Sequence, residues 1–66
     1  MKTIKTRIIK KGILKDEKIK IKELNNKEQK EYNCKYIITL GEYDDVYHEA
    51  ETIEEAIEFY NDYENN

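Results

Sequence analysis

The chain has 66 residues, of which 41% are charged, and it contains one cysteine and no proline. A chain of this length buries only about 60% of its unfolded surface, so residues 1–66 are expected to form one domain of low stability. A lone cysteine cannot form an internal disulfide, and no apolar run approaches the roughly 20 residues that cross a membrane. The composition therefore excludes a disulfide-linked secreted scaffold and a membrane-spanning helix, and we expect a cytoplasmic protein with no membrane partner.

The charges are divided unevenly between the two halves of the chain. Residues 1–30 hold eleven Lys and Arg against four acids, a balance of +7, whereas residues 31–66 hold one lysine against eleven acids, a balance of −10. The two balances sum to the net charge of −3. Such asymmetry is typical of a chain that meets a strongly charged partner, and it does not indicate which half makes the contact.

The first half predicts a basic β hairpin over residues 3–24. In residues 3–9, alternation would place three side chains toward the core, namely Ile4, Thr6 and Ile8. Residues 18–24 alternate more strictly, with Ile19 and Ile21 facing inward and lysines facing outward, as in an antiparallel strand with one solvated face. The polar residues 25–29 are expected to form a connection such as a hairpin loop.

The second half predicts an acidic strand, turn, strand and helix over residues 32–63. Residues 32–40 alternate as a half-buried strand, with five side chains on the inward face: Tyr32, Cys34, Tyr36, Ile38 and Leu40. Residues 41–45 supply a turn, and a short return strand continues the inward face with Val46, His48 and Ala50. On this pattern Cys34 is a buried packing residue rather than a reactive thiol.

A capped amphipathic helix follows the return strand. Thr52 and Glu55 have the spacing of a capping box, in which each side chain accepts a hydrogen bond from the other residue's backbone amide. An apolar stripe has helical spacing and contains Ile53, Ala56, Ile57 and Tyr60. The opposite face is acidic and contains Glu54, Glu55, Glu58 and Asp62.

These elements predict an α+β domain, a four-stranded antiparallel β meander followed by one C-terminal helix packed on one sheet face. The helix stripe must cover the sheet because no other expected element can do so. The predicted core is Ile4, Ile8, Ile19, Ile21, Cys34, Tyr36, Ile38, Leu40, Val46, Ile53, Ala56, Ile57 and Tyr60. The second sheet face is left to Lys, Thr and Tyr, and a homodimer is one way to stabilise so thin a core.

The residue types argue against catalysis. The chain has no serine, its only histidine is His48, and it has two glycines, so it lacks a nucleophile–histidine dyad and a glycine-rich phosphate loop. His48 is better explained as a strand residue. Glu42, Asp44 and Asp45 lack the number and spacing of calcium ligands and are better explained as a solvated turn. We expect no enzyme activity, no cofactor and no metal site.

The acidic second half favours binding to a basic protein. Its carboxylates can occupy a basic groove built for phosphates and gain association rate by electrostatic steering, while two tyrosines act as amphipathic anchors. The partner would be a basic protein such as a nucleic-acid-binding enzyme. The predicted partner-binding residues are Glu42, Tyr43, Asp44, Asp45, Tyr47, Glu49, Glu54, Glu55, Glu58 and Asp62.

The basic first half supports an alternative, a small nucleic-acid-binding protein. A Lys-rich hairpin can neutralise phosphates, although a lysine-rich outward face is also ordinary protection of a sheet edge. The residues predicted for this alternative are Lys5, Arg7, Lys10, Lys11, Lys18, Lys20 and Lys22.

The short length and the Lys, Ile, Asn, Glu and Tyr bias of the whole chain resemble small accessory proteins of phages and mobile elements in low-GC bacteria. This class includes anti-CRISPR inhibitors, and the resemblance implies an acidic inhibitor of a nuclease. Tyr36–Ile38 and Thr52–Ile57 are similar to the strand-to-helix unit of HicB-like antitoxins, and four strands followed by a helix is the order in positive-cofactor-4-like single-stranded-DNA binders. These last two resemblances imply nucleic-acid binding.

Overall fold

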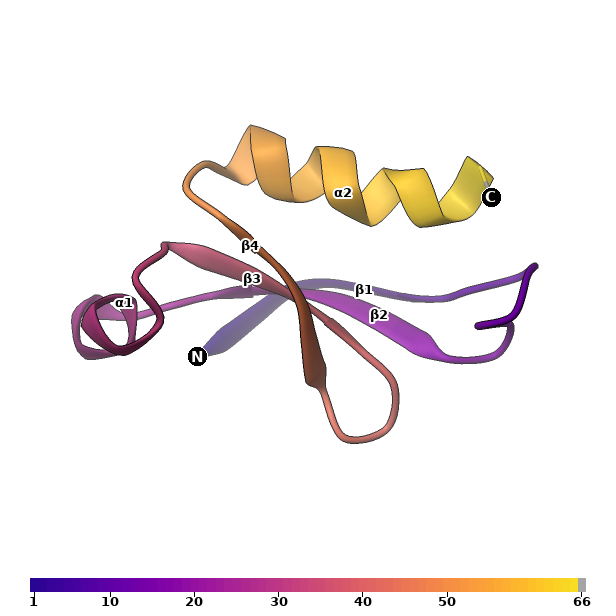
Figure 1. The fold of residues 1–66 in the computed structure, drawn as a ribbon, viewed down its shortest axis with the longest axis horizontal. Coiled ribbons are helices and arrows are strands. Elements are labelled where there is room, and N and C mark those ends of the chain that lie inside the picture. Colours follow the sequence, from indigo (N-terminus) through magenta and orange to yellow (C-terminus); the bar gives the residue numbers. More distant parts are fainter. Residues whose placement is uncertain (66) are drawn as a thin grey trace.

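The computed structural model describes residues 1–65, and the side chains of residues 1–62. Six elements follow one another along the chain (Figure 1): β1 Lys2–Ile8, β2 Lys18–Glu23, α1 Asn26–Tyr32, β3 Tyr36–Leu40, β4 Asp45–Ala50 and α2 Ile53–Asn65. The strands form one sheet in the order β1-β2-β3-β4, and each neighbouring pair is antiparallel. The predicted α+β class, with four antiparallel strands in one sheet and a C-terminal helix, is confirmed.

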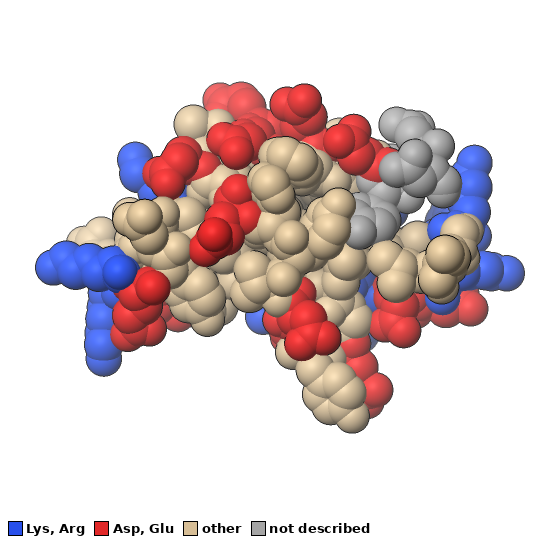
Figure 2. Space-filling model, viewed as in Figure 1, with Lys and Arg blue, Asp and Glu red and all other residues tan. Residues whose placement is uncertain are grey.

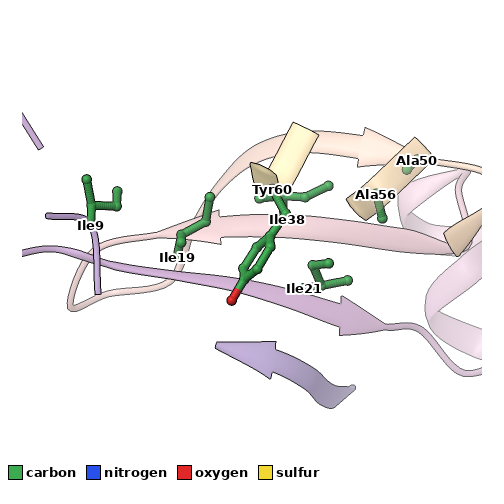
Figure 3. Close-up of a cluster of buried hydrophobic side chains, with 7 residues drawn as sticks. All are labelled: Ile9, Ile19, Ile21, Ile38, Ala50, Ala56 and Tyr60. Carbon is green, nitrogen blue, oxygen red and sulfur yellow. The ribbon is translucent and has the colours of Figure 1, made fainter. Parts of the chain in front are cut away.

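Helix α2 lies along one side of the sheet and contacts β2, β3 and β4 (Figure 1). The Thr52 hydroxyl accepts a hydrogen bond from the Glu55 amide at 3.2 Å, which is one half of the predicted capping box. The apolar stripe of α2 meets the inward isoleucines in a shared cluster (Figure 3): Ile9, Ile19, Ile21, Ile38, Ala50, Ala56 and Tyr60. Five further predicted core residues pack partly buried against this cluster: Ile4, Tyr36, Leu40, Ile53 and Ile57.

The inward face of β1 is the opposite of the predicted one over most of the strand. The register shifts between Thr3 and Lys5, so Ile4 is an extra residue in β1, and beyond it Arg7 pairs with the core residue Ile19. Because successive strand residues point to opposite faces, this one-residue bulge turns Ile9 inward and Ile8 outward. Ile9 is 1% exposed and Ile8 is 44% exposed, so the prediction that Ile8 is a core residue is wrong.

A second bulge changes the inward face of β4. His48 pairs with Ile38, but Val46 pairs with Thr39, so Tyr47 is the extra residue. Val46 therefore lies on the far face from α2 and is 47% exposed, which makes its assignment to the core wrong. His48 is a strand residue as predicted, and its ring lies 3.5 Å, centroid to centroid, from the ring of Phe59 on α2.

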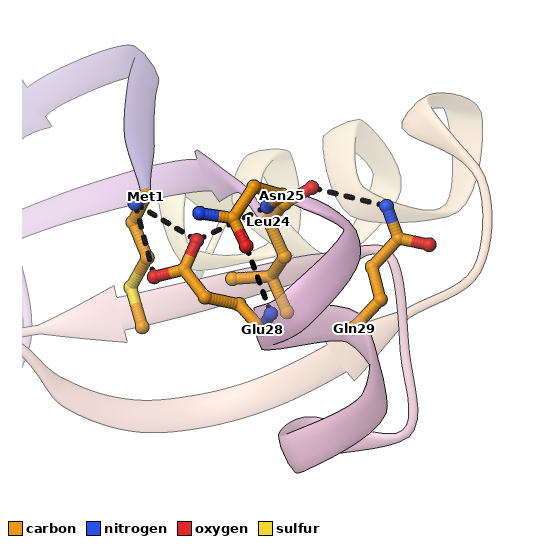
Figure 4. Close-up of polar contacts among 5 residues, drawn as sticks. All are labelled: Met1, Leu24, Asn25, Glu28 and Gln29. Atoms are coloured by element: carbon orange, nitrogen blue, oxygen red, sulfur yellow. Dashed lines mark hydrogen bonds and ion pairs between the residues drawn. The ribbon is translucent and has the colours of Figure 1, made fainter.

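Helix α1 occupies the segment predicted as a polar connection and ends at Tyr32, the first residue of the predicted strand 32–40, whereas β3 itself begins only at Tyr36. It has no buried residue, so its sequence lacks the apolar periodicity from which a helix is predicted. Its signal is a capping box: the Asn25 side chain accepts from the Glu28 amide at 2.8 Å, and the Glu28 carboxylate accepts from the Asn25 amide at 3.0 Å (Figure 4). The α-amino group of Met1 lies 2.9 Å from the same carboxylate, and the Gln29 amide donates to the Leu24 carbonyl (Figure 4).

A second, smaller cluster lies on the sheet face away from α2. Leu24, Cys34 and Ile37 are buried there, and Tyr32 from the end of α1 packs against them. Cys34 is therefore buried as predicted, but it lies before β3 rather than within it, and it belongs to this second cluster instead of the predicted inward face with Ile38. The sheet face away from α2 therefore does not carry polar side chains alone, because α1 and the residues flanking it cover part of this face.

The two isoleucines at the end of β1 provide a direct test of the observed register. We expect Ile9→Ala to lower the free energy of unfolding by about 2–5 kcal/mol, because it empties a buried site, and Ile8→Ala to change it by less than about 1 kcal/mol. Urea unfolding followed by circular dichroism would measure both. Equal losses in the two variants, or a larger loss in Ile8→Ala, would contradict the register.

Candidate functional site

Helix α2 carries a row of free carboxylates. Glu54, Glu58 and Asp62 are exposed and follow one another at intervals of four residues, which is about 6 Å along the helix axis. Figure 2 shows the acidic side chains gathered over α2. Within the part of the chain that the structure describes, no ion pair or side-chain hydrogen bond holds these three carboxylates. Glu55, which was predicted with them, is half-buried.

The remaining predicted acidic residues do not join this row. Glu42, Tyr43, Asp45 and Tyr47 lie on the β3–β4 hairpin, and Figure 1 shows its turn on the side of the sheet away from α2. Strand β4, from Asp45 to Ala50, separates the turn from the start of α2, and six strand residues span about 20 Å. The structure therefore divides the predicted acidic surface between α2 and the hairpin.

Glu49 belongs to neither group. It pairs with Ile37, which places it on the sheet face away from α2, and its carboxylate lies 3.8 Å from the Cys34 sulfur. Burial raises the pKa of the Cys34 thiol, and the negative charges of Glu49 and Glu51 raise it further. A protonated, buried thiol is a poor nucleophile, so the environment of Cys34 favours packing over reactivity.

Asp44, from the predicted acidic set, forms ion pairs with two lysines of the predicted basic set. Its carboxylate lies 2.8 Å from the Lys20 amine and 3.1 Å from the Lys22 amine. The hydrogen bonds from Lys20 and then Lys22 hold the pKa of Asp44 below the usual range for aspartate. Asp44 occupies a left-handed turn position, with φ of 52°. The negative charge of Asp44 is therefore paired with the positive charges of Lys20 and Lys22.

The other predicted basic residues fall in two further places. The Arg7 guanidinium lies 4.8 Å from the centre of the Tyr60 ring on α2 and donates a hydrogen bond to the Tyr60 carbonyl, and the Lys5 amine lies 5.9 Å from the same ring. Lys10 and Lys11 are exposed on the β1–β2 loop, where Lys15 lies as well, and Lys18 is exposed at the start of β2. The predicted basic stripe is thus divided among the helix side of the sheet, its far face and the loop.

An open groove of about 450 Å³ lies between the β1–β2 loop and the β3–β4 hairpin; we call it the hairpin groove. It is lined by Leu14, Glu17, Leu40, Gly41, Glu42, Tyr43, Asp45, Val46 and Tyr47. Four of the predicted acidic-half residues contribute to it, namely Glu42, Tyr43, Asp45 and Tyr47. Sequence reasoning missed Leu14 and Glu17, because only the pairing of β2 with β3 brings the loop beside Gly41.

The groups that could support other chemistry are separated. Within residues 1–65, no group of three or more His, Cys, Asp and Glu side chains is placed to hold a metal ion. The ring of His48 is stacked on Phe59, whereas Cys34 lies in the second cluster on the opposite side of the sheet. The described surface instead carries charged groups, exposed tyrosines and the aliphatic side chains of the hairpin groove.

The comparisons with known proteins give no assignment: the chain matches no family model, no curated protein and no solved structure. Over the described residues, neither helix has the length and apolar character to cross a membrane. A functional proposal for this chain therefore rests on its own residues.

The Asp44 ion pairs predict a specific dependence of stability on pH. In the unfolded chain the pKa of Asp44 is about 3.9, and in the folded chain it is lower. These ion pairs therefore stabilise the fold above about pH 4, and this stabilisation is lost as the pH falls through the pKa of the folded chain. We expect Asp44→Asn to lower the free energy of unfolding by about 0.5–1 kcal/mol at pH 7, as for a half-exposed pair, and by progressively less below pH 4.

Urea unfolding between pH 2 and 7 would measure this difference. Asn tolerates the left-handed conformation at position 44, so the substitution tests the charge rather than the turn. Asp45→Asn is the matched control, since Asp45 is exposed and no ion pair with a described residue engages it. Identical pH profiles for the two variants would show that the Asp44 pairs contribute nothing.

Proposed function

We propose that this chain is a non-enzymatic, inhibitor-like binding protein that presents the carboxylates of α2 to a basic site on a protein partner. The observation that carries the proposal is the row of Glu54, Glu58 and Asp62, which is exposed and unpaired among the described residues. The partner site would be one that binds nucleic acid, because such a site already holds Lys and Arg positioned for a line of negative charges.

The arrangement of α2 supports this proposal. Ala56 and Tyr60, on the other face of the helix, are buried in the core, so the helix that carries the carboxylates is fixed against the sheet. A fixed row of charges loses less conformational entropy on binding than charges on a mobile segment. Opposite charges across the interface would also accelerate encounter, and the resulting binding would weaken as salt increases.

The proposal agrees with the resemblance to small accessory proteins of phages and mobile elements, including anti-CRISPR inhibitors. A single buried cysteine is compatible with a reducing compartment, and we place the protein in the cytoplasm as part of this proposal.

A charge-reversal pair tests the proposal. The probe is a fluorescein-labelled 20-residue oligolysine, titrated with the protein at about 50 and 200 mM salt. We expect Glu54→Lys combined with Glu58→Lys to weaken binding at least tenfold, because two adjacent carboxylates of the row become repulsive. We expect wild-type binding to weaken steeply at the higher salt concentration.

The matched control combines Glu23→Lys with Glu31→Lys, which changes the net charge equally at two exposed positions outside α2. We expect this control to weaken binding less than threefold. Equal losses in the two double variants would show that net charge, rather than the α2 row, determines binding. A wild-type chain that fails to bind the probe at 50 mM salt would contradict the proposal outright.

A second candidate function is nucleic-acid binding by the β1–β2 loop. Three lysines of the loop, Lys10, Lys11 and Lys15, and Lys18 at the start of β2 are exposed and are not held by ion pairs with described residues. Figure 2 shows basic side chains projecting at this end of the molecule. Lys20 and Lys22 are engaged by Asp44, so the loop, rather than the whole hairpin, is the part that favours this candidate.

Fluorescence anisotropy with labelled single- and double-stranded DNA and with RNA distinguishes the two candidates. The α2 proposal predicts no binding to any of these probes at 50 mM salt. The second candidate predicts micromolar binding that falls steeply between 50 and 200 mM salt and is lost in Lys10→Glu/Lys11→Glu/Lys15→Glu. Lys2→Glu/Lys27→Glu/Lys30→Glu is the control with equal charge change at other exposed sites, and it should retain that binding.

A further inference from the structure

The two walls of the hairpin groove are held in place by backbone hydrogen bonds. On the loop side, the Ile9 amide donates to the Glu17 carbonyl at 2.9 Å, and the Asp16 amide donates to the Ile9 carbonyl at 2.8 Å. On the hairpin side, the Gly41 amide donates to the Lys18 carbonyl at 2.9 Å. Backbone hydrogen bonds therefore hold both segments that form the groove.

Gly41 lies where the two walls meet. Its φ of 84° belongs to the left-handed region that favours glycine. A Cβ atom at this position would lie 3.3 Å from a carboxylate oxygen of Glu17, so the Glu17 side chain extends close over the hairpin backbone. Glu17 thereby joins the carboxylates of Glu42 and Asp45, which belong to the other half of the molecule.

The lining of the groove combines acidic side chains with aromatic and aliphatic surface. Of the described residues that line it, three are acidic and none is Lys or Arg. No ion pair with another described residue engages Glu17, Glu42 or Asp45. Tyr43 is 84% exposed and Tyr47 is 46% exposed, and Leu14, Leu40 and Val46 supply aliphatic surface.

This combination is complementary to a cation on an apolar stem. A bare metal ion is a poor fit, since no cluster of metal-ligating side chains lies among the described residues. An arginine side chain fits better than a lysine side chain, because its planar guanidinium can stack on a tyrosine ring and donate to two carboxylate oxygens together. The same stacking geometry occurs within this chain, where Arg7 lies over Tyr60.

We propose that the hairpin groove binds an arginine side chain from an extended segment of the partner protein, with an aliphatic residue beside that arginine. The guanidinium would lie among Glu17, Glu42 and Asp45 and against a tyrosine ring, while the aliphatic neighbour covers Leu14 and Val46. This inference rests on the proposed function, since it names a second contact with the same basic partner. It concerns a different surface, lined by the β1–β2 loop and the β3–β4 hairpin rather than by α2.

The test is a nuclear magnetic resonance titration of the 15N-labelled chain with the peptide acetyl-Leu-Arg-Leu-amide. We expect shifts of the backbone amide signals of residues 14–17 and 41–47. The peptide acetyl-Leu-citrulline-Leu-amide replaces the guanidinium with a neutral group of the same shape, and we expect it to bind at least tenfold more weakly. Tyr43→Ala should weaken binding of the arginine peptide about two- to fivefold by removing a stacking surface.

Glu42→Gln/Asp45→Asn should weaken binding of the arginine peptide at least tenfold, whereas the matched variant Glu23→Gln/Glu31→Gln, at two exposed positions outside the groove and the α2 row, should leave it within twofold. Both variants change exposed side chains, and the dispersion of the amide spectrum checks that each one folds. Shifts confined to other residues, equal binding of the citrulline peptide, or equal losses in the two variants would each overturn the groove proposal.

The outcomes also separate this inference from the proposed function. If oligolysine binding depends on Glu54 and Glu58 but the arginine peptide does not shift the groove signals, only the groove proposal fails. If the groove binds the arginine peptide while oligolysine binding is indifferent to the α2 variant, the proposed role of α2 fails and the groove remains.

Discussion

Burial of the β2 and β3 isoleucines against Ala56 and Tyr60 is the interaction on which the rest of the structure depends. Seven of the described residues are buried in the main cluster, so each position in it matters for a chain of this size. The two edge strands must present the correct alternate side chains to that cluster. The bulges at Ile4 and Tyr47 perform this adjustment: they turn Ile9 toward the core and Val46 away from it. Strand register therefore decides both the core and the charged surface.

The same register explains why the strong charge asymmetry of the chain does not produce two simple opposing patches. Arg7 points to the helix side because Ile9 does, and it packs over Tyr60. Lys20 and Lys22 point to the far face because Ile19 and Ile21 point inward, and there they meet Asp44 from the β3–β4 turn. Charges from the two halves thus neutralise one another across the sheet. Among the described residues, the charges without an ion-pair partner include those of the α2 row, the β1–β2 loop and the hairpin groove.

Two acidic surfaces with different chemistry follow from this arrangement. The α2 row is a line of carboxylates on a fixed helix, which suits a partner surface that is itself basic and extended. The hairpin groove is concave and lined partly by aromatic and aliphatic side chains, which suits a single cationic side chain with an apolar neighbour. A basic protein that contacts both surfaces would be recognised by its charge at the α2 row and by its shape at the hairpin groove.

The sequence by itself determined the α+β class, the four strands, the helical stripe of α2 and its acidic opposite face, because periodicity and capping are local properties of the chain. It also determined the buried position of Cys34. Helix α1 was not predicted because a short helix with no buried residue shows no apolar periodicity, although its Asn25 and Glu28 capping box was present in the sequence.

Only the tertiary structure decided the inward faces of β1 and β4, since a bulge of one residue leaves the local composition unchanged and reverses every side chain beyond it. It alone paired Asp44 with Lys20 and Lys22 and brought Glu17 beside Gly41, because these contacts join segments more than twenty residues apart that meet only when β2 and β3 are paired.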